Sequence, residues 1–295
     1  MEAEAEAMKE GIKRGIASLV FACYRKGILK NSLRVCSIPE TVETLIRSEK
    51  SLVRFGDGEI KLIAGREIPF QKPDAALVQR LQEILQNPQG NLLVALPDVF
   101  EDVSDFVPKS RDFWMEHMLF HRKDYERVCR KDRIYENAFF SRPYIMYRDK
   151  RGCGVLFERM KKIWEGREIV FVEGEISHNG VGVDLFDGAE SIQRILCPSS
   201  QAWEKYEQIL NECRKLSTDK LVLVSLGAAG KVLAQDLCCL GYRVVDIGSL
   251  DMEYGWFREG ATEKCRVPKH EVRTREENEK EGYFEYLDQI IATIR

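Results

Sequence analysis

Histidine, paired cysteine and long apolar runs are scarce in this sequence of 295 residues, and each scarcity excludes a class of protein. The four histidines show no H-E-x-x-H or other zinc spacing. The nine cysteines form no C-x-x-C, so we expect reduced thiols in a cytosolic protein. No apolar run approaches the roughly 18 residues of a membrane span. The start, M-E-A-E-A-E-A, is acidic, unlike a secretory signal peptide.

Motifs of several enzyme classes are missing as well. The sequence has no G-x-S-x-G elbow, no Walker A loop and no cysteine with an evident histidine partner. The net charge is only −3, so no overall basic field favours nucleic acid as a partner. An anionic ligand would have to be bound by a local site.

What the sequence does contain, from Pro39 onward, is an alternation of helical stretches and short apolar runs. The runs at 51–55, 91–100, 167–175, 191–198, 220–227 and 242–248 are expected to be strands. The stretches at 39–47, 73–85, 201–214, 229–240 and 284–294 are expected to be helices, and 104–165 is expected to be mostly helical. Such alternation favours an α/β fold with a mainly parallel sheet and helices on both faces.

Residues 1–35 differ from this body and are interpreted as an N-terminal helical extension, with one domain over 36–295. The helical pattern combines apolar and basic side chains, which are Ile12, Ile16, Leu19, Val20 and Cys23, and Lys9, Lys13, Arg14, Arg25, Lys26 and Lys30. One interpretation is a surface helix that packs on the body or on a second subunit, as in a homodimer. The other is a peripheral contact of residues 9–34 with an anionic membrane surface.

Acidic residues follow several predicted strands, where open parallel sheets bind ligands. Asp57 and Glu59 follow the first strand, and in extended chain they would point to the same side. Two carboxylates suit Mg2+ or Mn2+ held jointly with substrate phosphates. Arg54 is close by for a phosphate, and Gly56 lets a ligand approach the backbone. A solvated acidic turn is the alternative.

A second candidate site is the strand, G-A-A-G turn, helix and strand over 221–246. Gly227 would open the helix near a phosphate, and Asp246 stands where a ribose-binding acid would be expected. The full G-x-G-x-x-G is absent, so a glycine turn that only packs the helix is the alternative.

Further acids come from a glycine-rich loop, with Glu173 and Asp184, and from D-M-E, with Asp251 and Glu253. Asp251 and Glu253 are also typical of structural caps.

Seven stretches together resemble the GT-D glycosyltransferases, a Rossmann-like family long known only as a domain of unknown function. They are R-F-G-D-G-E, L-P-D-V-F, N-A-F-F-S-R-P-Y, I-W-E-G-R-E-I-V-F-V-E-G-E, G-V-G-V-D-L-F, I-L-C-P and D-I-G-S-L-D-M-E-Y-G-W-F, and they cover roughly residues 36–260. The resemblance implies transfer of a hexose, glucose or galactose being expected, from a UDP-sugar donor to a glycan acceptor in surface glycan or glycoprotein biosynthesis.

The resemblance assigns a role to one pair of residues, and the position of other residues in the sequence indicates further contacts. The family's acid-x-acid metal motif falls on Asp57 and Glu59, which would hold Mn2+ or Mg2+. The donor nucleotide-sugar would contact Arg54, Gly56, Arg142, Glu173, Gly227 and Asp246. Asp184, Asp251 and Glu253 are the candidates for the base that deprotonates the acceptor.

The chain departs from the family pattern at His178, Val183, Ser249 and the G-A-A-G loop, which bears on sugar specificity and on activity. Two other functions stay open: an NAD- or SAM-binding Rossmann enzyme, and an inactive scaffold of a glycan-assembly complex. The expected location is the cytoplasm, with the inner face of the membrane as a further expectation.

Overall fold

The structure is a computed structural model that describes residues 2–295, except the side chains at positions 2–5, 7 and 9. Nine strands form one sheet in the order β1-β4-β3-β2-β8-β7-β5-β6-β9, and every neighbouring pair is parallel. The strands are β1 Arg34–Val35, β2 Ser51–Arg54, β3 Leu92–Leu96, β4 Ile134–Asn137, β5 Glu168–Gly174, β6 Ser191–Cys197, β7 Leu221–Ser225, β8 Arg243–Asp246 and β9 Ile290–Thr293. The expected parallel α/β architecture is confirmed.

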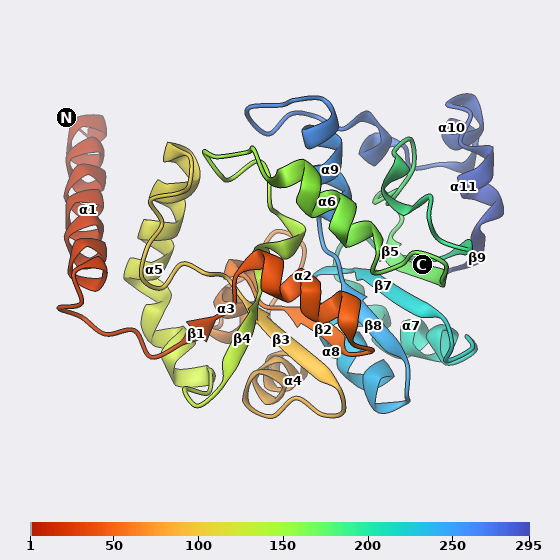
Figure 1. Ribbon diagram of the computed structural model, residues 1–295, viewed down its shortest axis with the longest axis horizontal. Helices are drawn as coiled ribbons and strands as arrows, with labels where there is room; N and C mark the ends of the chain where they lie inside the picture. Colours follow the sequence, from red (N-terminus) through yellow and green to blue (C-terminus); the bar gives the residue numbers. More distant parts are fainter. Residues whose placement is uncertain (1) are drawn as a thin grey trace.

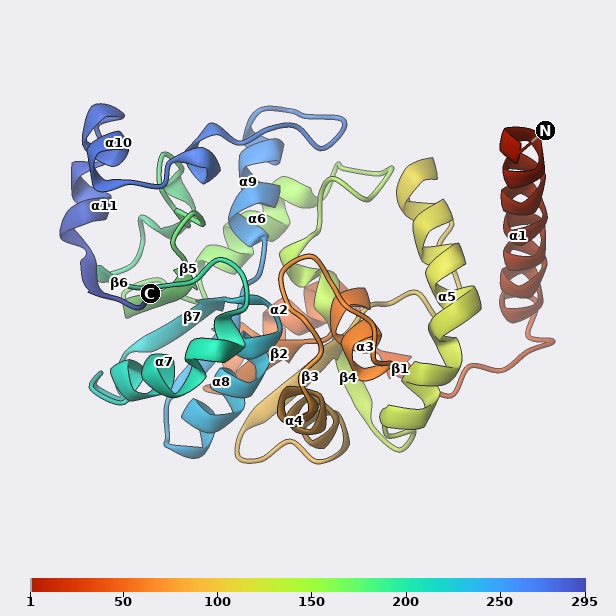
Figure 2. The same cartoon turned by 180° about the vertical axis from the view of Figure 1, so that it is seen from behind.

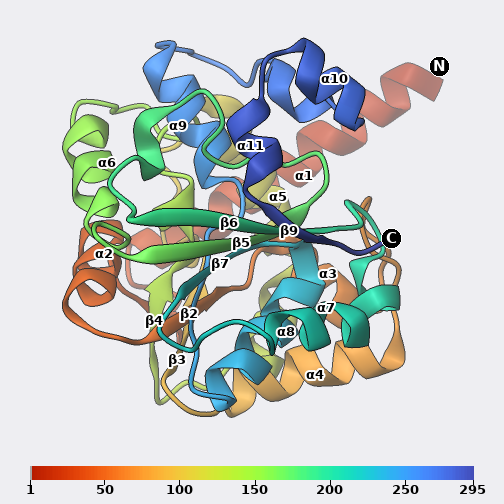
Figure 3. The same ribbon diagram turned by 90° about the vertical axis from the view of Figure 1, so that its right-hand side faces the viewer.

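Helices cover both faces of this sheet. They are α1 Glu2–Arg25, α2 Ile38–Arg47, α3 Asp57–Ile63, α4 Ala75–Gln86, α5 Pro108–Val128, α6 Cys153–Lys161, α7 Tyr206–Cys213, α8 Gly227–Cys239, α9 Leu250–Arg258, α10 Arg275–Lys280 and α11 Phe284–Asp288. Short 3-10 turns are η1 Ala138–Ser141, η2 Asp184–Phe186, η3 Ala202–Lys205 and η4 Pro268–Glu271. Helices α4, α7 and α8 pack together on one face, and α2 and α6 pack on the other (Figures 1 and 2). Figure 3 shows α6 and α9 across the sheet from α7 and α8.

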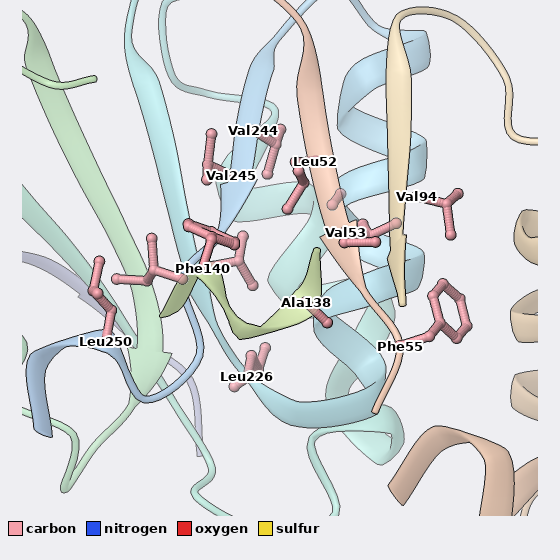
Figure 4. Packing of buried hydrophobic residues seen from close by; sticks show 14 of the residues in the cluster. Leu52, Val53, Phe55, Val94, Ala138, Phe140, Leu226, Val244, Val245 and Leu250 are labelled. Carbon is pink, nitrogen blue, oxygen red and sulfur yellow. The ribbon is translucent and has the colours of Figure 1, made fainter. Parts of the chain in front are cut away.

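The central strands are apolar on both sides because helices cover both faces. Leu52 and Val53 of β2 are fully buried, as are Val244 and Val245 of β8 (Figure 4). Burying such a side chain contributes about 1.5–3 kcal/mol. Phe55, which directly follows β2, is also fully buried and anchors the chain where it leaves the sheet.

Three local expectations differ from the structure. Asp57 and Glu59 do not lie in extended chain, because helix α3 begins at Asp57. The apolar stretch at 284–294 is not one helix: α11 ends at Asp288, and β9 then pairs with β6 at the sheet edge. The mostly helical middle contains strand β4, which joins β3 to β1.

The N-terminal segment forms one long helix that lies beside α5 at the end of the molecule (Figures 1 and 2). Ala17 and Phe21 are buried against the body, which anchors α1. Arg34 and Val35 already pair with β4, so the end of the expected extension belongs to the sheet. No helix in the described part of the chain is long and apolar enough to cross a membrane.

Candidate active site

A cleft of about 590 Å³ opens at the carboxyl ends of β2, β8, β7 and β5. Strands β2 and β8 are neighbours in the sheet. After β2 the chain continues to β3 on one side, and after β8 it continues to β9 at the opposite edge of the sheet. Such a reversal of direction is where open α/β sheets bind ligands. The predicted residues that line the cleft are Arg54, Gly56, Asp57, Glu59, Arg142 and Gly227.

The two acids at the start of α3 are oriented differently from one another. Residues two apart on a helix are rotated by roughly 200°, so the side chains diverge from the backbone. Asp57 accepts a hydrogen bond from Lys61 Nζ at 2.8 Å. Glu59 accepts the backbone N–H of Gly56 at 2.8 Å and lies 3.2 Å from Lys231 Nζ. Although burial opposes ionisation, Lys61 and then His117 lower the pKa of Asp57, so its carboxylate stays charged.

Arg54 and Asp246 form a buried ion pair under the cleft. Arg54 Nη2 donates to Asp246 Oδ1 at 2.9 Å, and Lys231 Nζ lies 3.0 Å from Asp246 Oδ2. Gly248, with φ of 46°, permits this pair, because a Cβ there would overlap the Arg54 guanidinium. Burial disfavours the charge, but Arg54 and Lys231 lower the pKa of Asp246.

This pairing changes the expected role of Asp246. The residue was expected to bind a ribose, but it does not line the cleft, and both of its oxygens already accept hydrogen bonds. It holds Arg54 and Lys231 in place instead. Arg54 does line the cleft, but its guanidinium donates to Asp246 and to Ser141 Oγ.

Arg142 is the cation with the fewest partners in the cleft wall. Within the described part of the chain it has no carboxylate partner, and its one side-chain hydrogen bond is a long 3.4 Å to Ser249 Oγ. Burial and the neighbouring Arg54 lower the pKa of Arg142, as expected for a cation that lacks a counter-ion. An anionic ligand would supply the missing partner.

The four other predicted acids lie outside the cleft, and each is engaged elsewhere. Glu173 is buried against Arg194 at 2.6 Å. Asp184 accepts from Lys161 at 2.9 Å and Tyr254 at 2.8 Å, beside a second cavity.

The D-M-E stretch, which supplied two of the candidates for the base, has both of its acids turned inward on α9. Glu253 accepts the backbone N–H of Ile145 at 2.9 Å, and Asp251 accepts that of Gly180 at 2.8 Å. Met252, between them, faces the cleft. Consecutive residues on a helix point in different directions, so Met252 can face the cleft while Asp251 and Glu253 face inward. The sequence pattern did not reveal this orientation.

Among the cleft residues that the sequence did not single out, two carry a charge or a titratable ring inside the wall. Lys231 is buried on α8 and bridges Glu59 and Asp246. Its signal was a lone lysine inside the apolar stretch A-A-G-K-V-L-A. His270 lines the cleft from η4, and nothing in its charged surroundings in the sequence marked it.

Comparison with known proteins places this geometry in a family. The model of the family described as "Glycosyltransferase GT-D fold" matches residues 52–275. The chain belongs to the GT-D glycosyltransferases.

A solved GT-D structure, described as "The highly conserved domain of unknown function 1792 has a distinct glycosyltransferase fold", is 40% identical with a TM-score of 0.82. The match covers 90% of this chain and 96% of that one. A second, "A New Glycosyltransferase (DUF1792) from Streptococcus sanguinis", is 36% identical with a TM-score of 0.81, over 89% of this chain and 100% of that one.

Two curated relatives carry the GT-D domain within longer chains. Glycosyltransferase GlyD of Streptococcus pneumoniae serotype 4 is 40% identical over 269 residues, which are 89% of this chain and 33% of that protein. The probable glycosyl transferase Gly of Streptococcus gordonii is 40% identical over 273 residues, or 90% of this chain and 39% of that protein. The present chain therefore spans little more than a third of these relatives.

The departures from the GT-D pattern separate into two groups. Ser249 and the G-A-A-G residues Gly227 and Ala228 line the cleft, where they can contact a ligand. His178 is fully buried, and Val183 lines the second cavity. Only the first group is placed to alter donor specificity directly.

Proposed function

We propose that this chain transfers a hexose from a UDP-sugar to a glycan acceptor in this cleft, with Mn2+ or Mg2+ as cofactor. The observation that carries the proposal is the combination of Arg142, which lacks a carboxylate partner, with two carboxylates in the same cleft wall. Arginine is well suited to phosphate oxygens, and a carboxylate pair is suited to a divalent ion that bridges to them.

The donor set fits such an ion. No group of three or more histidine, cysteine, aspartate or glutamate side chains that could cage a metal occurs in the described part of the chain. Asp57 and Glu59 leave α3 in different directions and are paired with Lys61 and Lys231, so they would hold the ion jointly with phosphate oxygens by exchanging these lysine partners. When bound, the ion would neutralise charge on the leaving diphosphate. Lys61 and Lys231, which balance the two acids, also line the cleft.

The rest of the cleft supports binding of a diphosphate. Helix α8 directs its N-terminus at the cleft, where Gly227 and Ala228 form the wall. The first N–H groups of a helix have no partner within it, so they can bind phosphate. Arg142 would contact the diphosphate directly, and Arg54 would contribute charge from its fixed position against Asp246. A rival NAD- or SAM-binding function would need Asp246, which does not line the cleft.

The test is a panel of UDP-sugars with Mn2+, followed by donor hydrolysis and by transfer to candidate glycans. Asp57→Asn should lower turnover by about 10²-fold or more, because one electrostatic contact in the transition state is lost. The matched control is Asp187→Asn, an exposed acid far from α3 in the sequence, which should behave as wild type. Metal-independent turnover that Asp57→Asn leaves unchanged would refute the metal role. UDP binding without any turnover would instead favour an inactive scaffold.

Arg142 tests the phosphate contact separately from the metal. Replacing Arg142 by Ala should weaken UDP binding at least tenfold, since a hydrogen bond to a charged group contributes about 1.5–3 kcal/mol. Uridine, which lacks phosphates, should bind wild type and variant equally. Arg111→Ala, which removes an exposed arginine of α5, is the control for charge alone. Equal UDP affinity in Arg142→Ala and wild type would disprove the contact.

A further inference from the structure

His270 is a titratable side chain of the cleft that the proposed donor contacts do not use. It lies on the short turn η4, its ring lines the cleft, and its side chain is 20% exposed. Its Nδ1 makes no hydrogen bond within the described part of the chain. The ring is therefore held in the wall of the cleft with one nitrogen available to a ligand.

The other ring nitrogen lies against a buried carboxylate. His270 Nε2 is 3.4 Å from Asp251 Oδ2, an ion-pair contact without hydrogen-bond geometry, and Asp251 is only 1% exposed. Asp251 is itself fixed by Lys269 Nζ at 2.8 Å and by the Gly180 N–H at 2.8 Å. Although burial opposes ionisation, His270 and Lys269 lower the pKa of Asp251, so the carboxylate stays charged.

A charged carboxylate behind Nε2 selects one form of the imidazole. A neutral ring with its proton on Nε2 places an N–H rather than a lone pair next to this carboxylate, and it leaves the lone pair on Nδ1. A histidine oriented by a carboxylate is a recurrent arrangement for a general base.

The geometry points to His270 as the base that deprotonates the acceptor hydroxyl, with Asp251 as its positioning residue. This inference rests on the proposed function. The acceptor O–H proton passes to His270 Nδ1 as the acceptor oxygen bonds to the anomeric carbon of the donor. The bond from that carbon to the diphosphate oxygen breaks, and its electron pair leaves with UDP. The imidazolium afterwards returns its proton to solvent. Such a single displacement inverts the anomeric configuration.

The other acids of the cleft are less suited to this step. Asp57 and Glu59 are paired with lysines and assigned to the metal. Glu67 lines the cleft, but it is exposed and has no hydrogen-bond or ion-pair partner in the described part of the chain. It is the rival base, and Glu67→Gln belongs in the same experiment.

The experiment compares His270→Ala, His270→Gln, Asp251→Asn and Glu67→Gln with wild type, using the donor that the UDP-sugar panel identifies and Mn2+. Both His270 variants should lose about 10²–10⁴-fold in kcat, the usual contribution of a general base. Their dissociation constant for UDP should stay within about threefold of wild type. Added imidazole should restore part of the rate of His270→Ala, because it can enter the space left by the ring. Asp251→Asn should lower kcat while the donor KM is unchanged.

The outcomes separate this inference from the proposed function. A wild-type chain that neither binds UDP nor transfers sugar refutes the proposed function, and the inference falls with it. If wild type transfers sugar, full activity of the His270 variants, no rescue by imidazole, or a larger loss in Glu67→Gln overturns the inference alone. A parallel loss of UDP binding in both His270 variants also overturns it, because the residue would then serve binding. The wild-type product gives an independent check: a retained anomeric configuration excludes the base.

Discussion

At the scale of single residues, Glu253 shows how a buried carboxylate can be structural. It accepts the backbone N–H groups of Tyr144 at 3.0 Å and Ile145 at 2.9 Å, directly after Arg142 and Pro143. Burial raises the pKa of Glu253, and the two N–H groups oppose that rise. The acid therefore fixes the turn that carries Arg142 into the cleft.

Replacing Glu253 by Ala should lower the free energy of unfolding by about 1–3 kcal/mol, because buried N–H groups lose their acceptor. The donor KM should rise, since Arg142 loses its support, while kcat stays close to wild type. Denaturant unfolding and steady-state kinetics measure the two effects. Glu259→Ala, an exposed acid at the end of the same helix, is the control. A fall in kcat at unchanged stability would instead identify Glu253 as a base.

Individual residues also show what the sequence could predict about the site. Asp57 and Glu59 were found because they follow a recognisable strand, and both line the cleft. Asp251 and Glu253 also come soon after a strand, β8, yet α9 turns them inward. Distance along the chain places a residue near a sheet edge, but the helix rotation decides whether it faces the ligand.

At the scale of elements, His178 joins the glycine-rich loop to the C-terminal helices. Its Nε2 lies 2.9 Å from Asn278 Oδ1 of α10, and its ring stacks on Tyr286 of α11 at 4.3 Å between centroids. The residue has φ of 45° and is fully buried. Burial lowers the pKa of His178 below its ordinary value.

This contact should make the C-terminal helices sensitive to acid. Because the folded-state pKa of His178 lies below the unfolded value of about 6.5, the unfolded chain binds more protons at mildly acidic pH. The stabilisation is fully present above pH 6.5 or so and declines as the pH falls below that value. Amide exchange of residues 275–288 should therefore accelerate between pH 7.5 and pH 5.5. Exchange that is the same in wild type and His178→Asn, after correction for intrinsic rates, would contradict this prediction.

Helix α1 keeps a second apolar face after packing on α5. Met8, Ile12, Ile16 and Leu19 are between 48% and 70% exposed, on the side opposite Ala17 and Phe21. Basic residues outnumber acidic ones over residues 9–34, although the whole chain is acidic. We propose an anionic membrane surface as the partner of this face, because apolar side chains can enter the interface while lysine and arginine contact the headgroups.

The full chain should therefore co-sediment with anionic vesicles. The double variant Ile12→Glu, Leu19→Glu should weaken this binding at least tenfold, since each apolar side chain contributes about 1.5–3 kcal/mol when buried. Val155→Glu, at an equally exposed apolar site on α6, is the control. Absence of vesicle binding, together with a dimer that the double variant dissociates, would assign this face to a second subunit instead.

At the scale of the whole molecule, the cleft belongs to the sheet rather than to any one segment. Its walls come from loops after β2, β8, β7 and β5, which are up to about 190 residues apart in the chain, as the pairing of Arg54 with Asp246 shows. A ligand bound there contacts distant parts of the fold at once. Binding of the ligand should therefore stabilise the complete domain against unfolding.

UDP with Mn2+ should raise the melting temperature of the domain. At a ligand concentration of about 100 times Kd, linkage adds about 2.7 kcal/mol. For a domain of this size, each kcal/mol shifts the midpoint by about 2–4 °C, so a rise of at least 5 °C is expected. Differential scanning fluorimetry should show the rise, and EDTA or Asp57→Asn should remove most of it. A larger shift with NAD or S-adenosylmethionine would favour a different function.

The sequence by itself determined the class of fold, because continuous apolar strands between amphipathic helices can be buried only in a covered parallel sheet. It also determined the position of Asp57 and Glu59 at a strand end. Tertiary structure decided the rest. It paired Asp246 with Arg54 and Lys231, left Arg142 without a carboxylate, and brought His270 to the cleft beside Asp251. These outcomes depend on strand order and helix rotation, which bring together charges that are far apart in the chain.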